Sequence, residues 1–147
     1  MKNRMLLILI AACMQFPSAA QAVCINSDGT SGRHPSVEKE YNDSDYVISG
    51  VVESQKVIPD PDDSTGYAGI EYKIRVVRTY KGTGENELKI YSENSSGRFP
   101  MNLRTTYLLF IEQHENKLGV DSCGNSGLET DKISVTKKLQ ELSSRKF

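Results

Sequence analysis

The residues with the strongest chemical potential in this sequence are its three cysteines, Cys13, Cys24 and Cys123. Cys13 lies inside an apolar leader, so a mature chain would keep only the other two. An even pair of cysteines in an exported chain predicts one disulfide, between Cys24 and Cys123. In the chain-entropy model, a bridge that closes a loop of roughly 100 residues stabilises a fold by about 4–5 kcal/mol, less any strain in the bond.

The leader comprises residues 1–22 and is typical of a secretory signal peptide. Lys2 and Arg4 precede the apolar run Met5–Ala12, and Pro17 separates that run from the small-x-small cleavage pattern Ala20-Gln21-Ala22. The apolar run is too short to span a bilayer, which takes roughly 20 residues. We therefore expect export to the bacterial periplasm or to the outside of the cell.

Lipidation is the alternative use of a cysteine in this region. Ile10-Ala11-Ala12 before Cys13 resembles a lipoprotein cleavage site, although Cys13 comes early and the leader continues to Ala22. Cys24 is a poor lipidation site, because Gln21-Ala22-Val23 lacks the apolar-then-small pattern. A thiol nucleophile at Cys24 or Cys123 is not expected either, since an oxidising compartment favours their pairing.

The remaining titratable residues form no catalytic or metal-binding motif. His34 and His114 are about 80 positions apart, whereas a zinc site needs three or four converging ligands, usually with one closely spaced pair. Asp60, Asp62, Ser64 and Glu71 match an EF-hand spacing, but Thr65 stands where that loop needs glycine. With no nucleophile elbow and no phosphate-binding glycine loop, we expect no enzymatic activity, no cofactor and no metal.

Length and charge indicate a single domain, residues 23–147, with no affinity for nucleic acid. Removal of the leader leaves 125 residues, and the loss of Lys2 and Arg4 changes the net charge from −1 to −3. Tyrosines occur beside basic residues in the middle of the chain, as in barrels that bind single strands. Acidic residues are interspersed among them, so we expect neither a nucleic-acid partner nor, for want of a further long apolar run, a membrane span.

The elements that would position these residues are mainly strands. Alternation and β-branched residues predict strands over 46–52, 70–80, 88–91, 105–112 and 117–121. Helices are predicted over 36–41, after an N-cap candidate, and over 131–145, where Val135, Leu139 and Leu142 form one apolar stripe. Gly50, inside the first strand, indicates a bulge or sharp coil.

This order of elements predicts a mostly β fold. Five strands with a short N-terminal helix and a longer C-terminal helix fit a five-stranded, OB-fold-like Greek-key barrel, whose closure removes exposed sheet edges. A β-sandwich is the main alternative.

A series of ordered segments resembles the netrin-like module of tissue inhibitors of metalloproteinases and their bacterial relatives. These segments are Cys24 near the predicted N-terminus, SDYVISGVV (44–52), YKIRVVRTYKG (72–82), YLLF (107–110) and LGVDSCG (118–124). The resemblance covers about 100 residues and implies an OB-type barrel with flanking helices. It also implies that the Cys24–Cys123 bridge ties the N-terminal segment to the end of the fifth strand.

The resemblance further implies an interaction with a protein partner. In that family an N-terminal cysteine chelates the catalytic zinc of a protease through its amine and carbonyl oxygen, which fills the open position of the metal. Here Val23 is the predicted first residue and Cys24 the second, and the loop 94–98 lacks the cysteine found in the family. We expect Val23, Cys24 and Ile25 to form a ridge that binds a protein, with inhibition of a zinc endopeptidase as the alternative. A barrel that binds an oligosaccharide or another small ligand is the third hypothesis.

Overall fold

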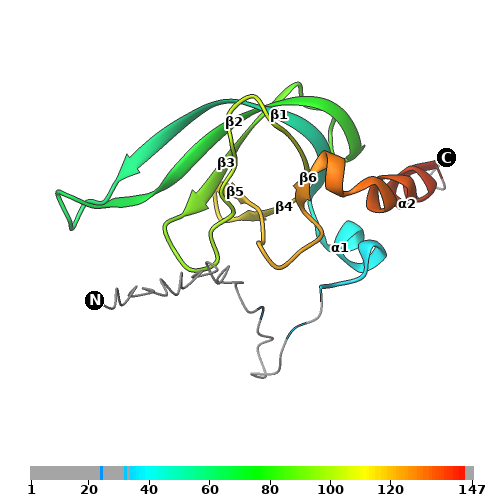
Figure 1. The fold of residues 1–147 in the computed structure, drawn as a ribbon, viewed down its shortest axis with the longest axis horizontal. Coiled ribbons are helices and arrows are strands. Elements are labelled where there is room, and N and C mark those ends of the chain that lie inside the picture. The colour runs from blue at the N-terminus through cyan, green and yellow to red at the C-terminus, as the bar shows by residue number, and fades with distance from the viewer. Residues whose placement is uncertain (1–23, 25–31, 33, 145–147) are drawn as a thin grey trace, which may run out of the picture.

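The computed structural model describes Cys24, Gly32 and residues 34–144. The predicted signal peptide, Cys13, Val23 and Ile25 therefore lie outside the described residues. The elements follow one another as α1 (Val37–Asp43), β1 (Tyr46–Pro59), β2 (Tyr67–Lys81), β3 (Glu87–Glu93), β4 (Thr106–His114), β5 (Lys117–Gly119), β6 (Gly127–Leu128), the 3-10 turn η1 (Glu129–Asp131) and α2 (Ile133–Ser144) (Figure 1).

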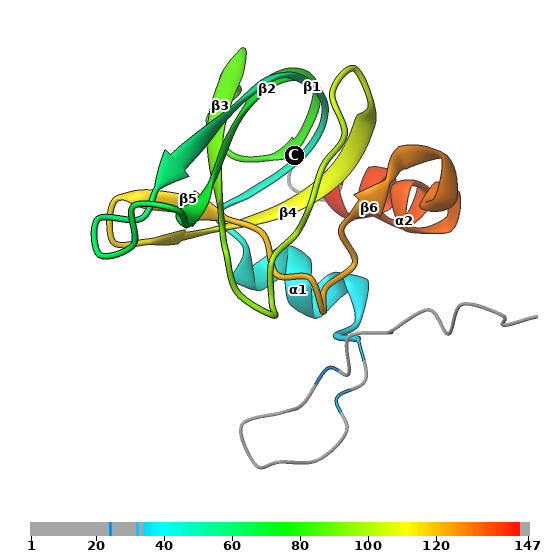
Figure 2. The same cartoon turned by 60° about the vertical axis from the view of Figure 1, so that its left-hand side comes forward.

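Five strands close into a ring. They are hydrogen-bonded in the order β1-β2-β3-β5-β4, and β4 pairs back with β1, while the two-residue β6 adds to β4. β3 and β5 run parallel and every other pair is antiparallel. The arrangement confirms the prediction of a mostly β, barrel-like Greek-key fold with a short helix before the strands and a longer one after them (Figure 2).

The inside of the ring is filled with side chains from the strands. Ile48, Tyr72, Ile74 and Leu109 are at most 2% exposed and belong to one apolar cluster. The buried Tyr72 hydroxyl accepts a hydrogen bond from the Met101 backbone N–H at 3.2 Å. The ring interior is thus a core in which a tyrosine hydroxyl has a partner.

A second apolar cluster lies outside the ring, between the strands and both helices. Val47, Leu108 and Phe110 point outward from β1 and β4 and meet Tyr41 of α1 and Leu139 of α2. Val135 and Leu142 pack against the same cluster, which confirms the predicted stripe on the C-terminal helix. Both helices therefore cover one side of the ring (Figure 2).

β1 and β2 are longer than predicted, and the hairpin that they form reaches past the rest of the ring (Figure 1). The sequence predicted that the first strand ends at residue 52, but its pairing with β2 continues to Pro59. The predicted irregularity at Gly50 is confirmed by a register shift between Ser49 and Gly50. A Cβ atom at Gly50 would lie 2.5 Å from Ile74 Cγ2, so the close approach of β2 requires glycine there.

None of the helices in the described part of the chain is both long and apolar enough to cross a membrane.

Candidate functional site

The predicted disulfide between Cys24 and Cys123 is present, and it fixes the start of the described chain to the loop between β5 and β6. The two Cα atoms are 5.6 Å apart, and 99 positions separate the residues in the sequence. His34 Nδ1 donates to the Cys123 carbonyl oxygen at 2.6 Å, and the Cys123 N–H donates to Asp121 Oδ1 at 2.8 Å. The bridge thereby holds Cys24 against Cys123, which is two positions after Asp121 in the sequence.

A buried carboxylate provides a second tie between the same two segments. Glu40 on α1 is 7% exposed, and its Oε2 accepts from the backbone N–H and the side-chain Nδ2 of Asn125 at 2.7 and 2.6 Å. Asn125 Nδ2 also donates to the Pro35 carbonyl oxygen at 2.9 Å. A Cβ atom at Gly124 would fall 2.0 Å from Glu40 Oε1, so only glycine leaves room for the carboxylate. Burial raises the pKa of Glu40, although the hydrogen bonds from Asn125 oppose this shift.

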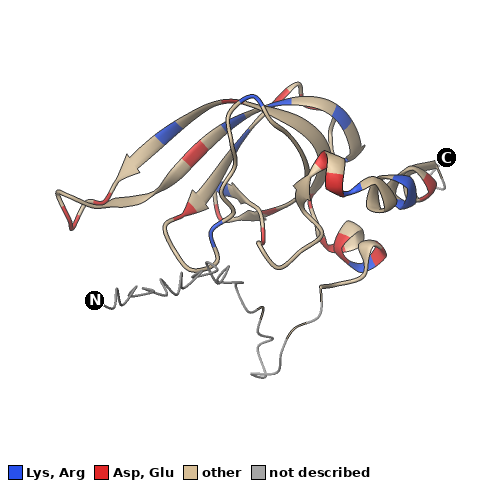
Figure 3. Ribbon diagram, viewed as in Figure 1, with Lys and Arg blue, Asp and Glu red and all other residues tan. Residues whose placement is uncertain are grey.

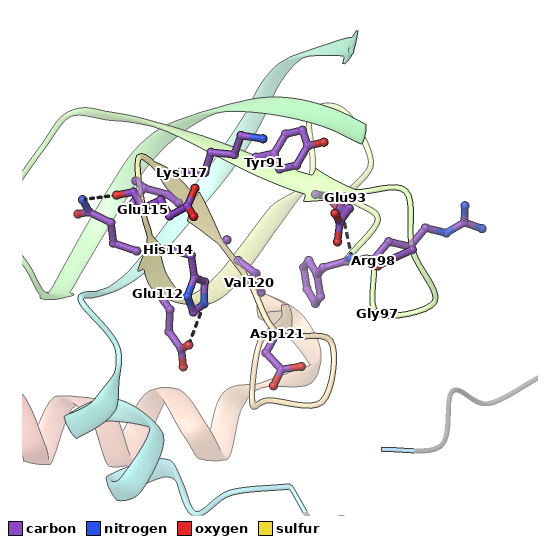
Figure 4. A pocket seen from close by; sticks show the side chains of 16 residues that line it. Tyr91, Glu93, Gly97, Arg98, Glu112, His114, Glu115, Lys117, Val120 and Asp121 are labelled. Carbon is purple, nitrogen blue, oxygen red and sulfur yellow. Dashed lines mark hydrogen bonds and ion pairs between the residues drawn. The ribbon is translucent and has the colours of Figure 1, made fainter. Parts of the chain in front are cut away.

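An open cleft of about 730 Å³ borders the loop that carries Cys123. One wall comes from the end of β3 and the loop 95–99, and the other from the β4–β5 hairpin together with Val120 and Asp121. Figure 4 shows Tyr91 and Lys117 at one end, Glu112 and His114 across from them, and Asp121 below. Asp121 lines the cleft and bonds to Cys123, so cleft and disulfide are neighbours.

Both aromatic rings of the cleft already have partners. Lys117 Nζ lies 4.0 Å from the centroid of the Tyr91 ring, a cation–π contact, and the Tyr91 hydroxyl donates to the Ala68 carbonyl at 3.0 Å. Phe99 stands edge-on to Tyr107 with centroids 6.1 Å apart. Lys117 thus covers one face of the Tyr91 ring, the kind of surface on which a sugar would stack.

The charged residues of the cleft are mostly acidic. Glu93, Glu112, Glu115 and Asp121 line it together with two cations, Arg98 and Lys117. The Arg98 guanidinium extends away from the middle of the cleft (Figure 4), and its Nη1 donates to the Tyr67 hydroxyl at 3.4 Å. The cleft therefore carries an excess of negative charge.

The residues singled out from the sequence lie in different places. Cys24 is bridged to the loop between β5 and β6, which borders the cleft, whereas Val23 and Ile25 lie outside the described residues. His34 contacts Cys123 and His114 lines the cleft. Among residues 34–144 with Cys24 and Gly32, no three His, Cys, Asp or Glu side chains come close enough together to hold a metal ion.

Sequence reasoning missed the cleft, because its lining comes from three segments that carry no motif. The one available signal was the alternation of β3, which placed Tyr91 and Glu93 on the face opposite the core residues Leu88 and Ile90. That alternation says nothing about which loop would lie opposite them.

Comparison with known proteins found no family model and no curated protein that matches the chain. The fold and the site define a class all the same: a small, mostly β, disulfide-linked domain with one side of its ring covered by helices and an open acidic cleft beside its bridge.

Proposed function

We propose that the chain is an exported, non-enzymatic, netrin-like binding domain that contacts a protein partner. The contact surface would combine the N-terminal residues around Cys24 with the neighbouring cleft. The observation that carries this proposal is the position of the disulfide, which holds Cys24 to a loop whose Asp121 lines the cleft. A partner that meets the N-terminal residues would thus meet the cleft as well.

Three features favour a protein over a small ligand. The ring interior is occupied by buried side chains such as Tyr72 and Ile74, so an enclosed ligand would have to displace the core. The cleft is open and polar rather than a closed apolar pocket of the kind that binds small molecules. Its two rings are engaged by Lys117 and Tyr107, which disfavours the oligosaccharide alternative.

Inhibition of a zinc endopeptidase is a second candidate, favoured by the anchoring of Cys24. A bridge to Cys123 would present the amine of Val23 from a fixed point, and that amine could fill the open coordination position of a protease zinc. Titration of the purified protein against a panel of zinc endopeptidases tests this candidate. Inhibition that is lost on acetylation of the N-terminus would support it, and no inhibition at micromolar concentration would end it.

Site-specific photo-crosslinking tests the main proposal. A photoreactive phenylalanine analogue is placed at Gln113 in the cleft, at Ile25, and at the exposed Gln140 of α2 as the control. Crosslinking in the producing cells should join the same protein to the first two positions and not to the third. Adducts from all three positions alike, or from none, would contradict a partner surface at this place.

A further inference from the structure

We infer that the cleft binds an extended, cationic peptide segment of the partner, one that presents lysine or arginine side chains. This inference rests on the proposed function and specifies the chemistry of the partner. It is carried by the charge balance, the lining and the backbone geometry of the cleft.

Two carboxylates of the cleft, those of Glu93 and Glu115, are uncompensated, unlike three carboxylates on β1, β2 and β3. Glu53, Glu71 and Glu87 each lie within 4.0 Å of a lysine or arginine nitrogen on β2 or β3, and Figure 3 shows both signs along this part of the sheet. Within the described part of the chain, the side chains of Glu93 and Glu115 have no ion pair or hydrogen bond. The cleft thus holds two carboxylates that no cation of the described chain neutralises.

The cations beside the cleft do not neutralise these groups. Arg98 is turned toward Tyr67 and Asn94. Lys117 stands over the Tyr91 ring and has no carboxylate within 4.0 Å among the residues that the structure describes. Glu112 meets His114 at 3.3 Å, a partner that is charged only when protonated. The cleft is therefore complementary to a cationic ligand.

The lining of the cleft suits the long side chains of lysine and arginine. Phe99, Leu118 and Val120 are half-buried against the core and contribute apolar surface to the cleft, while the carboxylates of Glu93 and Glu115 are exposed. Lysine and arginine lay their aliphatic stems along apolar surface and keep the charged group in contact with polar groups. A lone metal ion or a small amine would contact only the carboxylates and would leave the apolar lining of the cleft uncovered.

The backbone of β3 indicates that the ligand is extended. β3 and β5 share the single pair Ile90–Leu118, although β3 continues to Glu93. The Asn94 N–H donates to the carbonyl oxygen of Ala68 on β2. Because hydrogen-bonded and non-hydrogen-bonded pairs alternate along an antiparallel ladder, the N–H and C=O groups of Tyr91 and Glu93 point away from β2. The Glu93 carbonyl oxygen already accepts from the Ser95 N–H at 2.9 Å. The Glu93 N–H and the Tyr91 carbonyl oxygen are therefore the groups at the cleft with which an added peptide strand could align.

Titration with synthetic peptides, followed by backbone amide NMR, tests the inference on the purified protein with its disulfide intact. The probes are acetylated and amidated eight-residue peptides that alternate alanine with lysine, with glutamine or with glutamate. The lysine peptide should shift the amide resonances of Tyr91, Lys117 and Gly119 and bind about tenfold more tightly than the glutamine peptide. Its affinity should fall as salt is added, because the cleft carboxylates are exposed.

Two double variants with the same change in net charge locate the interaction. Glu93→Gln with Glu115→Gln should weaken binding of the lysine peptide about fivefold, since it removes the two unpaired carboxylates. Asp62→Asn with Glu141→Gln, both exposed and outside the cleft, should change the affinity by less than about twofold. Equal weakening by both variants would overturn the inference, because binding would then follow net charge and not the cleft.

The remaining outcomes separate this inference from the proposed function. If the glutamine or glutamate peptide shifts the cleft resonances and the lysine peptide does not, the cationic preference is wrong and the cleft remains a binding surface. If no peptide binds but crosslinking from Gln113 still captures a protein, the peptide inference fails and the proposed function stands. Failure of both experiments would refute both proposals.

Discussion

Lys81 illustrates how one side chain completes the first helix. Its ammonium group donates to the carbonyl oxygens of Tyr41, Asn42 and Ser44 at 2.9, 2.8 and 2.5 Å. The last carbonyls of a helix have no partner within the helix, and a cation at that end also interacts favourably with the helix dipole. Lys81, at the end of β2, thus joins the sheet to the C-terminus of α1.

We expect Lys81→Met to destabilise the fold by about 1.5–3 kcal/mol, the range for hydrogen bonds to a charged group. Methionine keeps most of the aliphatic stem and removes the three bonds. Urea unfolding measures the loss, with Lys117→Met as the control, for which the cation–π contact predicts a change of about 0.5–1 kcal/mol. Equal midpoints for the two variants would show that the carbonyls are satisfied without Lys81.

Glu40 makes stability depend on pH in a direction opposite to that of most carboxylates. Burial raises the pKa of Glu40, so the folded protein holds this proton more tightly than the unfolded chain does. The contribution of Glu40 to stability is then fully present below the unfolded-chain pKa and is lost as pH rises through the raised, folded-state pKa.

The wild type should therefore lose stability relative to Glu40→Gln as pH rises from about 4 toward neutrality. Glutamine keeps an oxygen that can accept from Asn125 and does not ionise. Urea unfolding of both proteins across this range gives the difference in free energy, and Glu141→Gln on the exposed face of α2 serves as the control. A difference between wild type and Glu40→Gln that stays constant with pH would contradict the assignment.

At the scale of elements, α2 is held by one fully buried residue. Leu139 is 0% exposed and packs with Tyr80 and Phe110, whereas Ile133 at the start of the same helix is 62% exposed. Leu139→Ala should cost about 2–5 kcal/mol, because it removes buried methyl groups and leaves a cavity.

Ile133→Ala is the matched control and should change stability by less than about 0.5 kcal/mol, since it touches no buried cluster. Thermal or urea unfolding distinguishes the two variants. Similar small losses for both would mean that α2 adds little to the second apolar cluster and that the ring folds without it.

The elements that could be predicted from the sequence are those with a buried face. β2 alternates Ile70, Tyr72, Ile74 and Val76 toward the ring interior, and this period identified the strand. Residues 53–57 of β1 are all exposed, so no alternation marked them, and pairing with β2 alone makes this stretch a strand. The two-residue β6 likewise depends on its neighbour β4.

At the scale of the whole molecule, the pairing of Cys24 with Cys123 could be predicted and the cleft could not. Two cysteines in an exported chain leave one partner each, which is a property of the sequence alone. The cleft depends on the loop 95–99 and the β4–β5 hairpin facing each other across β3, which is a property of the closed ring. From the sequence pattern, Glu93 and Glu115 can be predicted only to be exposed. The fold is what brings both of them to the same cleft.

The disulfide and the Glu40–Asn125–Pro35 hydrogen bonds join the same two regions, and this has a consequence for the reduced protein. The bridge closes a loop of 99 positions, for which the chain-entropy model gives about 4–5 kcal/mol. We expect Cys24→Ser with Cys123→Ser to lose about that much in urea unfolding. The variant should still fold, because the hydrogen bonds and both apolar clusters persist without the bridge.

The double variant should no longer hold the N-terminal residues around Cys24 next to the cleft. Crosslinking from position 25 should decrease, because Cys24 is no longer held beside Asp121, while crosslinking from Gln113 should continue, because the cleft belongs to the ring. A well-dispersed amide spectrum is the control for folding. Loss of both crosslinks in a folded variant would mean that the partner binds the N-terminal segment first. Retention of both would mean that the N-terminal segment meets the partner without being held by the bridge.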